Sequence, residues 1–265
     1  MIRTEYRDKM KVVILAGGRG SRLSEETDLK PKPMVEIGGR PILWHIMKHY
    51  AHYGFKEFFI ALGYKGEAIK RYFLDYYGLT GSMTINLSNG EIKPLEKESE
   101  NWLVHLIDTG LETLTGGRIK RLEPWLTDGP FMMTYGDGVS NIDLVDLLRF
   151  HQSRGRLATM TAVRPPARFG ALVIDGDLVP RFTEKSQVTE GWINGGFLVL
   201  EPGVLRYLSG DNASLEGEAL QHLAADGQLA AYKHEGFWQP MDTLRDVRLL
   251  ESLWETKKAP WKVWE

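Results

Sequence analysis

Short apolar runs alternate with amphipathic segments in the first half of the chain. Residues 12–16 and 58–62 are rich in β-branched or aromatic side chains, which is typical of strands covered on both faces of a parallel sheet. After Pro41, apolar side chains recur at intervals of three and four residues, which predicts a helix, and residues 68–76 repeat this pattern. This order predicts a doubly wound sheet with right-handed crossovers. Further along we expect a helix over 116–122, a strand over 131–135 and a helix over 143–154 capped by Asn141 or Asp143.

Strand patterns dominate the second half. Two helices, over 216–225 and 244–254, would pack back on the sheet, and residues 88–101 form a polar excursion between apolar runs at 82–87 and 102–107. We therefore predict an α/β fold, a Rossmann-like mixed sheet flanked by helices with a β-rich second half, in one domain over 11–265 after a flexible extension, 1–10. The expected strands of this half are 158–163, 171–174, 179–183 and 197–200, with a hairpin turn at Asp175-Gly176-Asp177.

Composition narrows the possible chemistry. The 265 residues carry a formal net charge of -2 and include no cysteine, which excludes disulfides, thiolate metal sites and a cysteine nucleophile. No apolar run approaches the roughly 18 residues of a membrane-spanning helix, and the first ten residues lack a secretory h-region. We expect a cytoplasmic protein with neither a nucleic acid nor a membrane as its partner.

A glycine-rich turn, Gly17 to Ser21, follows the first expected strand. Successive glycines allow backbone N–H groups to converge on an anion, because no Cβ blocks the approach. The turn lacks the Gly-Lys-Ser/Thr of a P-loop, and Leu23 stands where a dinucleotide-binding loop has its third glycine. Arg22 and Lys32 would add a guanidinium and an ammonium for phosphate oxygens. The alternative is a tight strand-to-helix connection.

A short carboxylate, Asp137, follows the expected strand 131–135 and is flanked by glycines. Because ligands of open α/β sheets bind at the carboxyl ends of strands, this residue and the glycine-rich turn could share one crevice. Magnesium commonly combines one or two carboxylates with substrate phosphates. Asp242 is a second candidate, although as a residue near Leu244 it could instead cap a helix.

The motifs resemble those of a known family. Leu15-Ala16-Gly17-Gly18-Arg19-Gly20-Ser21-Arg22-Leu23, with Pro31-Lys32-Pro33-Met34 and Gly39-Arg40-Pro41, resembles the signature of the sugar-1-phosphate nucleotidyltransferases. One departure is Ser186, where the family has proline in Glu-Lys-Pro. Further stretches resemble the glucose-1-phosphate cytidylyltransferases of this family: Tyr135-Gly136-Asp137-Gly138, Arg168-Phe169-Gly170-Ala171-Leu172, Glu184-Lys185, Asn194-Gly195-Gly196-Phe197 and Gly236-Phe237-Trp238-Gln239-Pro240-Met241-Asp242-Thr243.

This resemblance implies an activity and a fold of the nucleotide-diphospho-sugar transferase type. A phosphate oxygen of glucose 1-phosphate would attack the α-phosphorus of CTP with Mg2+ present, giving CDP-glucose for deoxysugar or O-antigen-type polysaccharides and expelling pyrophosphate. No covalent enzyme nucleophile is required. Residues 11–155 would bind the nucleotide, and residues 156–265 would bind the sugar and support a homo-oligomer.

The resemblance also implies roles for individual residues. Arg22, Lys32 and Lys185 would be catalytic, and Asp137 and Asp242 would hold the metal. The residues implied to bind the substrates are Leu15, Gly17, Gly18, Gly20, Ser21, Thr115, Gly116, Gly136, Gly170, Glu184, Asn194 and Gly195.

Several alternatives stay open. The nucleotide could be UTP or dTTP, and the chain could be a non-catalytic regulatory subunit that binds nucleotide sugars, although its intact charged residues argue against that. His45, His49 and His52 have helical spacing, which we interpret as a partly exposed helix face rather than a metal site. The tryptophan-rich tail, 259–265, could pack on its own chain or on a partner, and Phe237 and Trp238 could flank the sugar or pack in the core.

Overall fold

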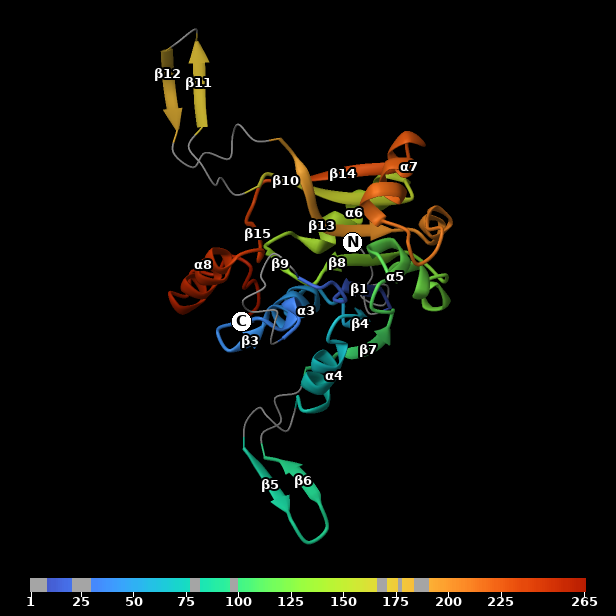
Figure 1. The fold of residues 1–265 in the computed structure, drawn as a ribbon, viewed down its shortest axis with the longest axis vertical. Coiled ribbons are helices and arrows are strands. Elements are labelled where there is room, and N and C mark those ends of the chain that lie inside the picture. Colours follow the sequence, from blue (N-terminus) through green and yellow to red (C-terminus); the bar gives the residue numbers. More distant parts are fainter. Residues whose placement is uncertain are drawn as a thin grey trace.

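The computed structural model describes residues 9–20, 30–76, 82–95, 100–165, 171–175, 178–183 and 191–265. In this part of the chain, seven strands form the main sheet in the order β14-β10-β13-β8-β1-β4-β7 (Figure 1). β13 is antiparallel to both of its neighbours, and the other pairings are parallel. The predicted mixed α/β sheet is therefore confirmed. Its strands are β1 Lys11–Leu15, β4 Glu57–Leu62, β7 Leu103–Asp108, β8 Phe131–Tyr135, β10 Ala158–Val163, β13 Ile193–Leu200 and β14 Leu229–His234.

Helices cover both faces of the sheet. Alternate side chains of the central strand β1 therefore lie in two different cores. Val12 and Ile14 lie in the core with α3, α6 and α8, whereas Val13 and Leu15 lie in the core with α5 and α7. Every helix in the described segments falls short of the length and apolarity needed to cross a membrane. The α-helices are α3 Ile42–His52, α4 Gly66–Leu74, α5 Thr115–Arg121, α6 Leu144–Arg154, α7 Leu220–Ala225 and α8 Leu244–Glu255.

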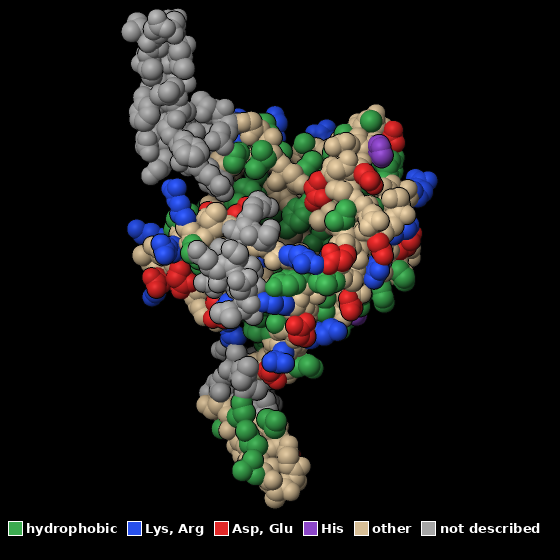
Figure 2. Space-filling view, viewed as in Figure 1, with side chains coloured by type: hydrophobic (Ala, Val, Ile, Leu, Met, Phe, Trp, Pro, Cys, Tyr) green, Lys and Arg blue, Asp and Glu red, His purple; other side chains and the backbone are tan. Residues whose placement is uncertain are grey.

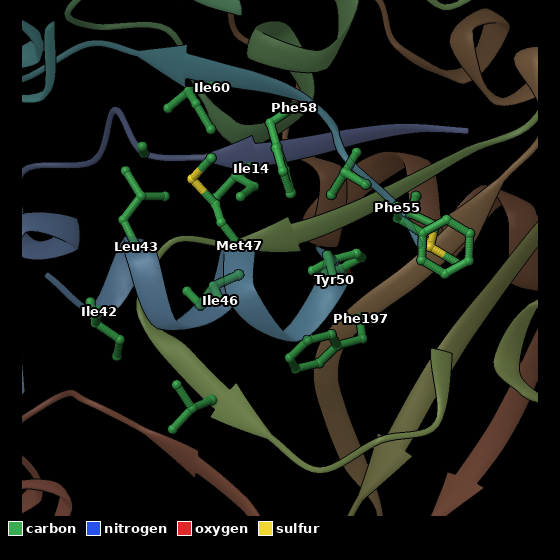
Figure 3. Close-up of a cluster of buried hydrophobic side chains, with 14 of the residues drawn as sticks. Ile14, Ile42, Leu43, Ile46, Met47, Tyr50, Phe55, Phe58, Ile60 and Phe197 are labelled. Carbon is green, nitrogen blue, oxygen red and sulfur yellow. The ribbon is translucent and has the colours of Figure 1, made fainter. Parts of the chain in front are cut away.

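The first core is built around α3 (Figure 3). Its apolar stripe follows the three- and four-residue spacing expected after Pro41, and these side chains are buried against the sheet. On α3 these residues are Ile42, Leu43, Ile46, Met47 and Tyr50, and the facing residues on the strands include Ile14, Phe58, Ile60 and Phe197 (Figure 3).

Asp143 and Asp242 were both candidate helix caps, and of these two only Asp143 caps its helix. Asp143 caps α6 as predicted, accepting from the backbone N–H of Val145 and of Asp146, both at 2.9 Å. Asp242 does not cap α8, because Thr243 takes that position and forms a capping box with Asp246. The carboxylate of Asp242 is thereby left for another contact.

The sequence pattern did not predict several of the strands. β14 has weakly alternating, partly exposed residues, and β9 (Gly138–Ser140) and β15 (Trp238–Pro240) have three residues each. The polar excursion contains a strand, since β5 (Met83–Asn86) and β6 (Glu91–Pro94) form a hairpin. β11 (Ala171–Asp175) and β12 (Leu178–Thr183) pair as predicted, and their turn residues Gly176 and Asp177 lie outside the described residues. The remaining short elements are β2 Glu36–Ile37, β3 Arg40–Pro41, the 3₁₀-helices η2 Lys32–Met34, η3 Glu123–Trp125 and η5 Pro202–Tyr207, and the π-helix η6 Leu215–Ala219.

The two hairpins extend from opposite ends of the molecule (Figure 1). Apolar side chains run along β5–β6 in the space-filling view (Figure 2). Ile85 pairs with Ile92 across this ladder, and both are about half exposed. Basic and acidic side chains are interspersed on the same face of the molecule (Figure 2), in keeping with the small net charge.

The predicted partly exposed histidine face of α3 is wrong for two of its members. His45 is fully buried, and its ring nitrogens contact the carbonyl oxygen of Ile37 (2.8 Å) and Nε1 of Trp261 (3.3 Å). His49 is also buried and contacts the carbonyl oxygen of Ile142 at 2.9 Å. Burial lowers the pKa of each to about 4, so both are neutral near pH 7.

These histidines predict an acid-sensitive fold. Because their folded-state pKa values lie below the ordinary 6.5, protonation favours the unfolded chain. Stability is full above about pH 6.5 and is lost as the pH falls toward 4, by about 3 kcal/mol for each histidine. Urea unfolding at pH 7.5, 5.5 and 4.5 measures this slope, which His49→Gln should reduce and His52→Gln, at an exposed position, should not. A free energy of unfolding that is flat over this range contradicts the prediction.

The C-terminal tryptophans pack against their own chain. Trp261 is fully buried and stacks with Phe237 and Trp254 at ring-centroid distances of 5.7 and 6.3 Å. Trp264 meets Trp44 edge-on at 5.9 Å. Of the two hypotheses for the tail, the structure supports packing within the chain, and Phe237 and Trp238 are partly buried and pack against the first core.

Candidate active site

A pocket of about 420 Å³ opens at the carboxyl ends of β1 and β8. The chain reverses direction there in loops, so backbone N–H groups and short side chains reach the pocket, as is usual for open α/β sheets. The lining residues are Leu15, Ala16, Gly17, Gly18, Gly20, Lys32, Pro33, Thr113, Leu114, Thr115, Arg118, Tyr135, Gly136, Asp137 and Glu216.

The glycines after β1 do different things. A Cβ on Gly17 would lie 2.3 Å from Nη1 of Arg118, so only glycine fits above that guanidinium. Gly18 has nothing within 4 Å of a Cβ position and faces open space. Gly20 adopts a φ of 65°, a left-handed conformation that glycine adopts without strain. The loop therefore rests on the protein at Gly17 and has open space beside Gly18.

The buried side chain of Arg118 donates a hydrogen bond to this loop. It projects from α5, is 4% exposed, and donates hydrogen bonds to neutral oxygens of the loop after β1, the end of β4 and the loop after β7. No carboxylate of the described residues lies within ion-pair distance of it. Burial, followed by the charge of Arg121, lowers its pKa, but a guanidinium stays protonated near pH 7. The acceptors are the carbonyls of Gly17 (3.0 Å), Leu62 (3.0 Å), Gly110 (2.7 Å) and Leu111 (3.3 Å) and the hydroxyl of Thr109 (2.8 Å).

Replacing Arg118 with Met should therefore loosen the pocket. We expect a loss of about 2–4 kcal/mol in the free energy of unfolding, because a buried hydrogen-bond network is broken, together with weaker nucleotide binding. Arg121→Met is the matched control, since Arg121 is exposed on the same helix and pairs with Asp211. Urea unfolding and calorimetric titration with a nucleoside triphosphate measure both effects. Equal behaviour of the two variants would contradict this role.

Lys32 joins two carboxylates beside the loop. Its Nζ lies 2.6 Å from Oδ2 of Asp137 and 2.7 Å from Oδ1 of Asp242, and the residue is only 6% exposed. Burial disfavours the ammonium, but the two carboxylates more than offset this and raise the pKa of Lys32 above its ordinary value. The lysine is thus a fixed positive charge at the pocket wall.

Local structure holds each member of this trio in place. Lys32 begins η2 between Pro31 and Pro33, so the backbone that presents it is restrained. The ladder of β9 with β15 brings the distant aspartates together, because Asp137 directly precedes β9 and Asp242 is the second residue after β15. The backbone N–H of Met241 donates to the carbonyl oxygen of Asp137 at 2.8 Å and closes the ladder.

Asp246 fixes the segment that carries Asp242. Its buried carboxylate accepts from the backbone N–H groups of Asp242 (3.1 Å) and Thr243 (2.9 Å) and from Nε2 of Gln239 (3.0 Å). The capping box of α8 therefore also orients a candidate metal ligand.

The structure brings eight of the predicted residues together in the pocket wall. Four described ones are not among the lining residues, and one of these, Asp242, reaches the wall through its contact with Lys32. Asn194 accepts from the backbone N–H of Gly196 (2.9 Å), the carbonyl of Gly195 accepts from Trp238 (2.7 Å), and Gly116 packs so closely that a Cβ would lie 2.8 Å from the carbonyl oxygen of Ala213. Those lining the pocket are Leu15, Gly17, Gly18, Gly20, Lys32, Thr115, Gly136 and Asp137; those outside the described residues are Ser21, Arg22, Gly170, Glu184 and Lys185.

Two charged pocket residues were not expected in the site. Arg118 lies within the expected helix 116–122, and Glu216 begins the expected helix 216–225. A basic residue directly after two glycines is the one local signal that could have drawn attention to Arg118. No local signal marks Glu216, which reaches the pocket through long-range folding.

Comparisons with known proteins identify the family of this chain. A family model described as nucleotidyl transferase matches residues 11–259. The chain belongs to the nucleotidyl transferase family. Glucose-1-phosphate cytidylyltransferase of Salmonella typhi is 51% identical over 97% of this chain and all of that protein. A probable glucose-1-phosphate cytidylyltransferase of Bacillus subtilis strain 168 is 46% identical over 96% of this chain and all of that protein.

The fold of this nucleotidyl transferase also matches solved structures. UDP-glucose pyrophosphorylase in complex with UDP-glucose aligns with a TM-score of 0.66 at 17% identity, covering 94% of this chain and 99% of that one. At this identity the likeness concerns the fold alone. The family and the fold type expected from the sequence motifs are confirmed.

Proposed function

We propose that this nucleotidyl transferase moves a cytidylyl group from CTP to α-D-glucose 1-phosphate, forming CDP-glucose and pyrophosphate. The observation that carries the proposal is the pocket lined by Lys32 and Asp137 beside a glycine-rich loop, where Lys32 also contacts Asp242. Support for the substrates comes from the two relatives at 51% and 46% identity, both named for this reaction.

The chemistry requires alignment and charge compensation from the protein. A phosphate oxygen of the sugar phosphate donates an electron pair to the α-phosphorus, and the bond from that phosphorus to the β-bridging oxygen breaks, so pyrophosphate leaves with the electron pair. Backbone N–H groups around Gly18 and the ammonium of Lys32 would bind phosphate oxygens and stabilise the charge that develops there. No side chain needs to form a covalent bond.

Asp137 and Asp242 have the donor chemistry for Mg2+. They are two carboxylates whose oxygens already converge on one cation, the ammonium of Lys32, and Mg2+ commonly binds one or two carboxylates together with substrate phosphates and water. The described residues contain no cluster of three acidic or histidine ligands. When bound, Mg2+ would neutralise charge on the reacting phosphates.

The remaining assignments are part of the same proposal. Arg22 and Ser21 would extend the phosphate contacts, Leu15, Thr115 and Gly116 would bind on the nucleotide side, and Lys185 would hold the sugar phosphate. Glu184, Asn194, Gly170 and Gly195 would surround the hexose. Self-association into a homo-oligomer also belongs here, as the family resemblance implies.

An assay of turnover separates an enzyme from a non-catalytic nucleotide-sugar-binding subunit. With CTP, glucose 1-phosphate and Mg2+, we expect release of pyrophosphate and an equal amount of CDP-glucose, identified by mass spectrometry. Binding of both ligands without pyrophosphate release would favour the non-catalytic subunit. Chelation of the divalent cation should stop turnover.

A further inference from the structure

The proposed function gives no role to the carboxylate of Glu216. Of the described residues that line the pocket, it and Asp137 are the acidic ones, and Asp137 is paired with Lys32. Glu216 is in the first turn of the π-helix η6, a rare geometry that is frequent at functional sites. A second negative charge in a pocket for two polyanionic substrates is unfavourable unless it faces an uncharged part of them.

The carboxylate of Glu216 is fixed by hydroxyl groups from other elements. The hydroxyl of Tyr135, at the end of β8, donates to Oε1, and Oγ1 of Thr115, at the start of α5, donates to Oε2 at 2.6 Å. Oγ1 of Thr115 also accepts from the backbone N–H of Leu215 at 3.1 Å, and Oγ of Ser214 lies 3.4 Å from Oε2. The position of the carboxylate is therefore set before any ligand binds.

These partners leave Glu216 able to accept more hydrogen bonds. They are neutral hydroxyls, and no lysine or arginine in the described segments pairs with it. Each carboxylate oxygen accepts about two hydrogen bonds, and the residue is exposed toward solvent and the pocket. Burial, and then the charge of Glu216, raise the pKa of Tyr135, so the phenol keeps the proton that it donates.

An ionised carboxylate can only accept, so the substrate group that faces it must donate. Phosphate oxygens are acceptors and are excluded, whereas sugar hydroxyls donate. Thr115 is on the expected nucleotide side, and Asn194, expected on the hexose side, forms a hydrogen bond that lowers the pKa of Tyr135. Glu216 thus stands between the two places where a hydroxyl-bearing ring would lie.

We propose that Glu216 is a substrate-binding residue that accepts a hydrogen bond from a sugar hydroxyl, on either the ribose of the nucleotide or the hexose of the sugar phosphate. This rests on the proposed function, because it takes both rings to be substrates of this pocket. The bond would orient the uncharged ring while the opposite wall of the pocket binds phosphates.

The test compares Glu216→Gln with Glu218→Gln, a control on the same π-helix at an exposed position that does not line the pocket. With CTP and glucose 1-phosphate, we expect Glu216→Gln to lower kcat/KM by about 10- to 100-fold, as for a hydrogen bond to a charged acceptor. Glu218→Gln should retain wild-type values.

Deoxy analogues then locate the hydroxyl. The defect of Glu216→Gln should shrink to less than about 3-fold with the one analogue that lacks the bonded hydroxyl, because wild type has already lost that bond. The nucleotide analogues are 2′-deoxy-CTP and 3′-deoxy-CTP, and the sugar phosphates are glucose 1-phosphates deoxygenated at each ring position. A match among the first set assigns the ribose, and a match among the second assigns the hexose.

Two results would overturn the proposal: a defect of equal size with every analogue, or wild-type kinetics of Glu216→Gln. Glu216→Asp keeps the charge but shortens the side chain by one methylene, so it should show the same analogue dependence. Agreement of the two variants would show that the effect does not come from misfolding of one of them. The wild-type reaction reports separately on the proposed function. If wild type prefers another nucleotide, or binds without turnover, the same comparison of variants uses that nucleotide's deoxy analogues or dissociation constants.

Discussion

Replacing Asp137 with Asn should reduce kcat/KM by about 1,000-fold or more, because the loss of a metal-binding carboxylate removes electrostatic stabilisation at the reacting phosphates. The side chain is nearly isosteric, and Asp137 is one third exposed, so the fold should be retained. Its backbone carbonyl, which accepts from Met241, is unchanged by the substitution. Pyrophosphate release over a range of Mg2+ concentrations measures the effect.

A control aspartate outside the pocket makes this result specific. Asp75 is exposed at the end of α4, so Asp75→Asn should keep wild-type turnover and the same Mg2+ dependence. If Asp137→Asn also turned over at wild-type rates, Asp137 would not belong to the metal site.

Replacing Lys32 with Met should also be severe, lowering kcat by about 100- to 1,000-fold, the range seen when one preorganised transition-state donor is lost. The substitution removes a charge that is 6% exposed and leaves Asp137 and Asp242 facing each other without a cation. We therefore expect a loss of about 2 kcal/mol in stability as well, since like charges are left together in a partly buried place. Mg2+ alone should restore part of this stability.

Lys30→Met is the matched control for Lys32. Lys30 is in the same proline-flanked segment but is more exposed and pairs with Glu36 at 3.1 Å, so its loss should change kcat by less than about 2-fold, as for a surface ion pair. Thermal unfolding with and without Mg2+, together with pyrophosphate release, compares the two variants. Equal kinetics of Lys32→Met and Lys30→Met would remove Lys32 from the reacting centre.

Local pattern was enough for the elements that have strong periodicity. β1, α3 and β4 could be predicted because continuous apolar runs and a helical stripe report burial directly. β14 could not, because an edge strand of mixed polarity has no such signal. β9 and β15 are short, and each exists only because the other pairs with it across a long stretch of chain.

The residues of the candidate site divide in the same way, into those that local pattern predicts and those that depend on long-range folding. The glycine-rich loop and Lys32 could be identified from spacing and charge, whereas the meeting of Asp137 with Asp242 depends on the β9–β15 ladder and was implied only by family resemblance. Arg118 is a charged side chain buried by neutral acceptors, and a sequence pattern gives no view of such burial. His45 was misjudged for the same reason, since a buried carbonyl partner is invisible in the sequence.

The most direct test of the proposed reaction is pyrophosphate release with glucose 1-phosphate and Mg2+ when CTP, UTP, dTTP, ATP and GTP are supplied in turn at equal concentration. We predict that kcat/KM with CTP exceeds each of the others by at least about 10-fold, a difference of about 1.4 kcal/mol in transition-state binding. Equal or faster turnover with UTP or dTTP would contradict the assignment of a cytidylyltransferase.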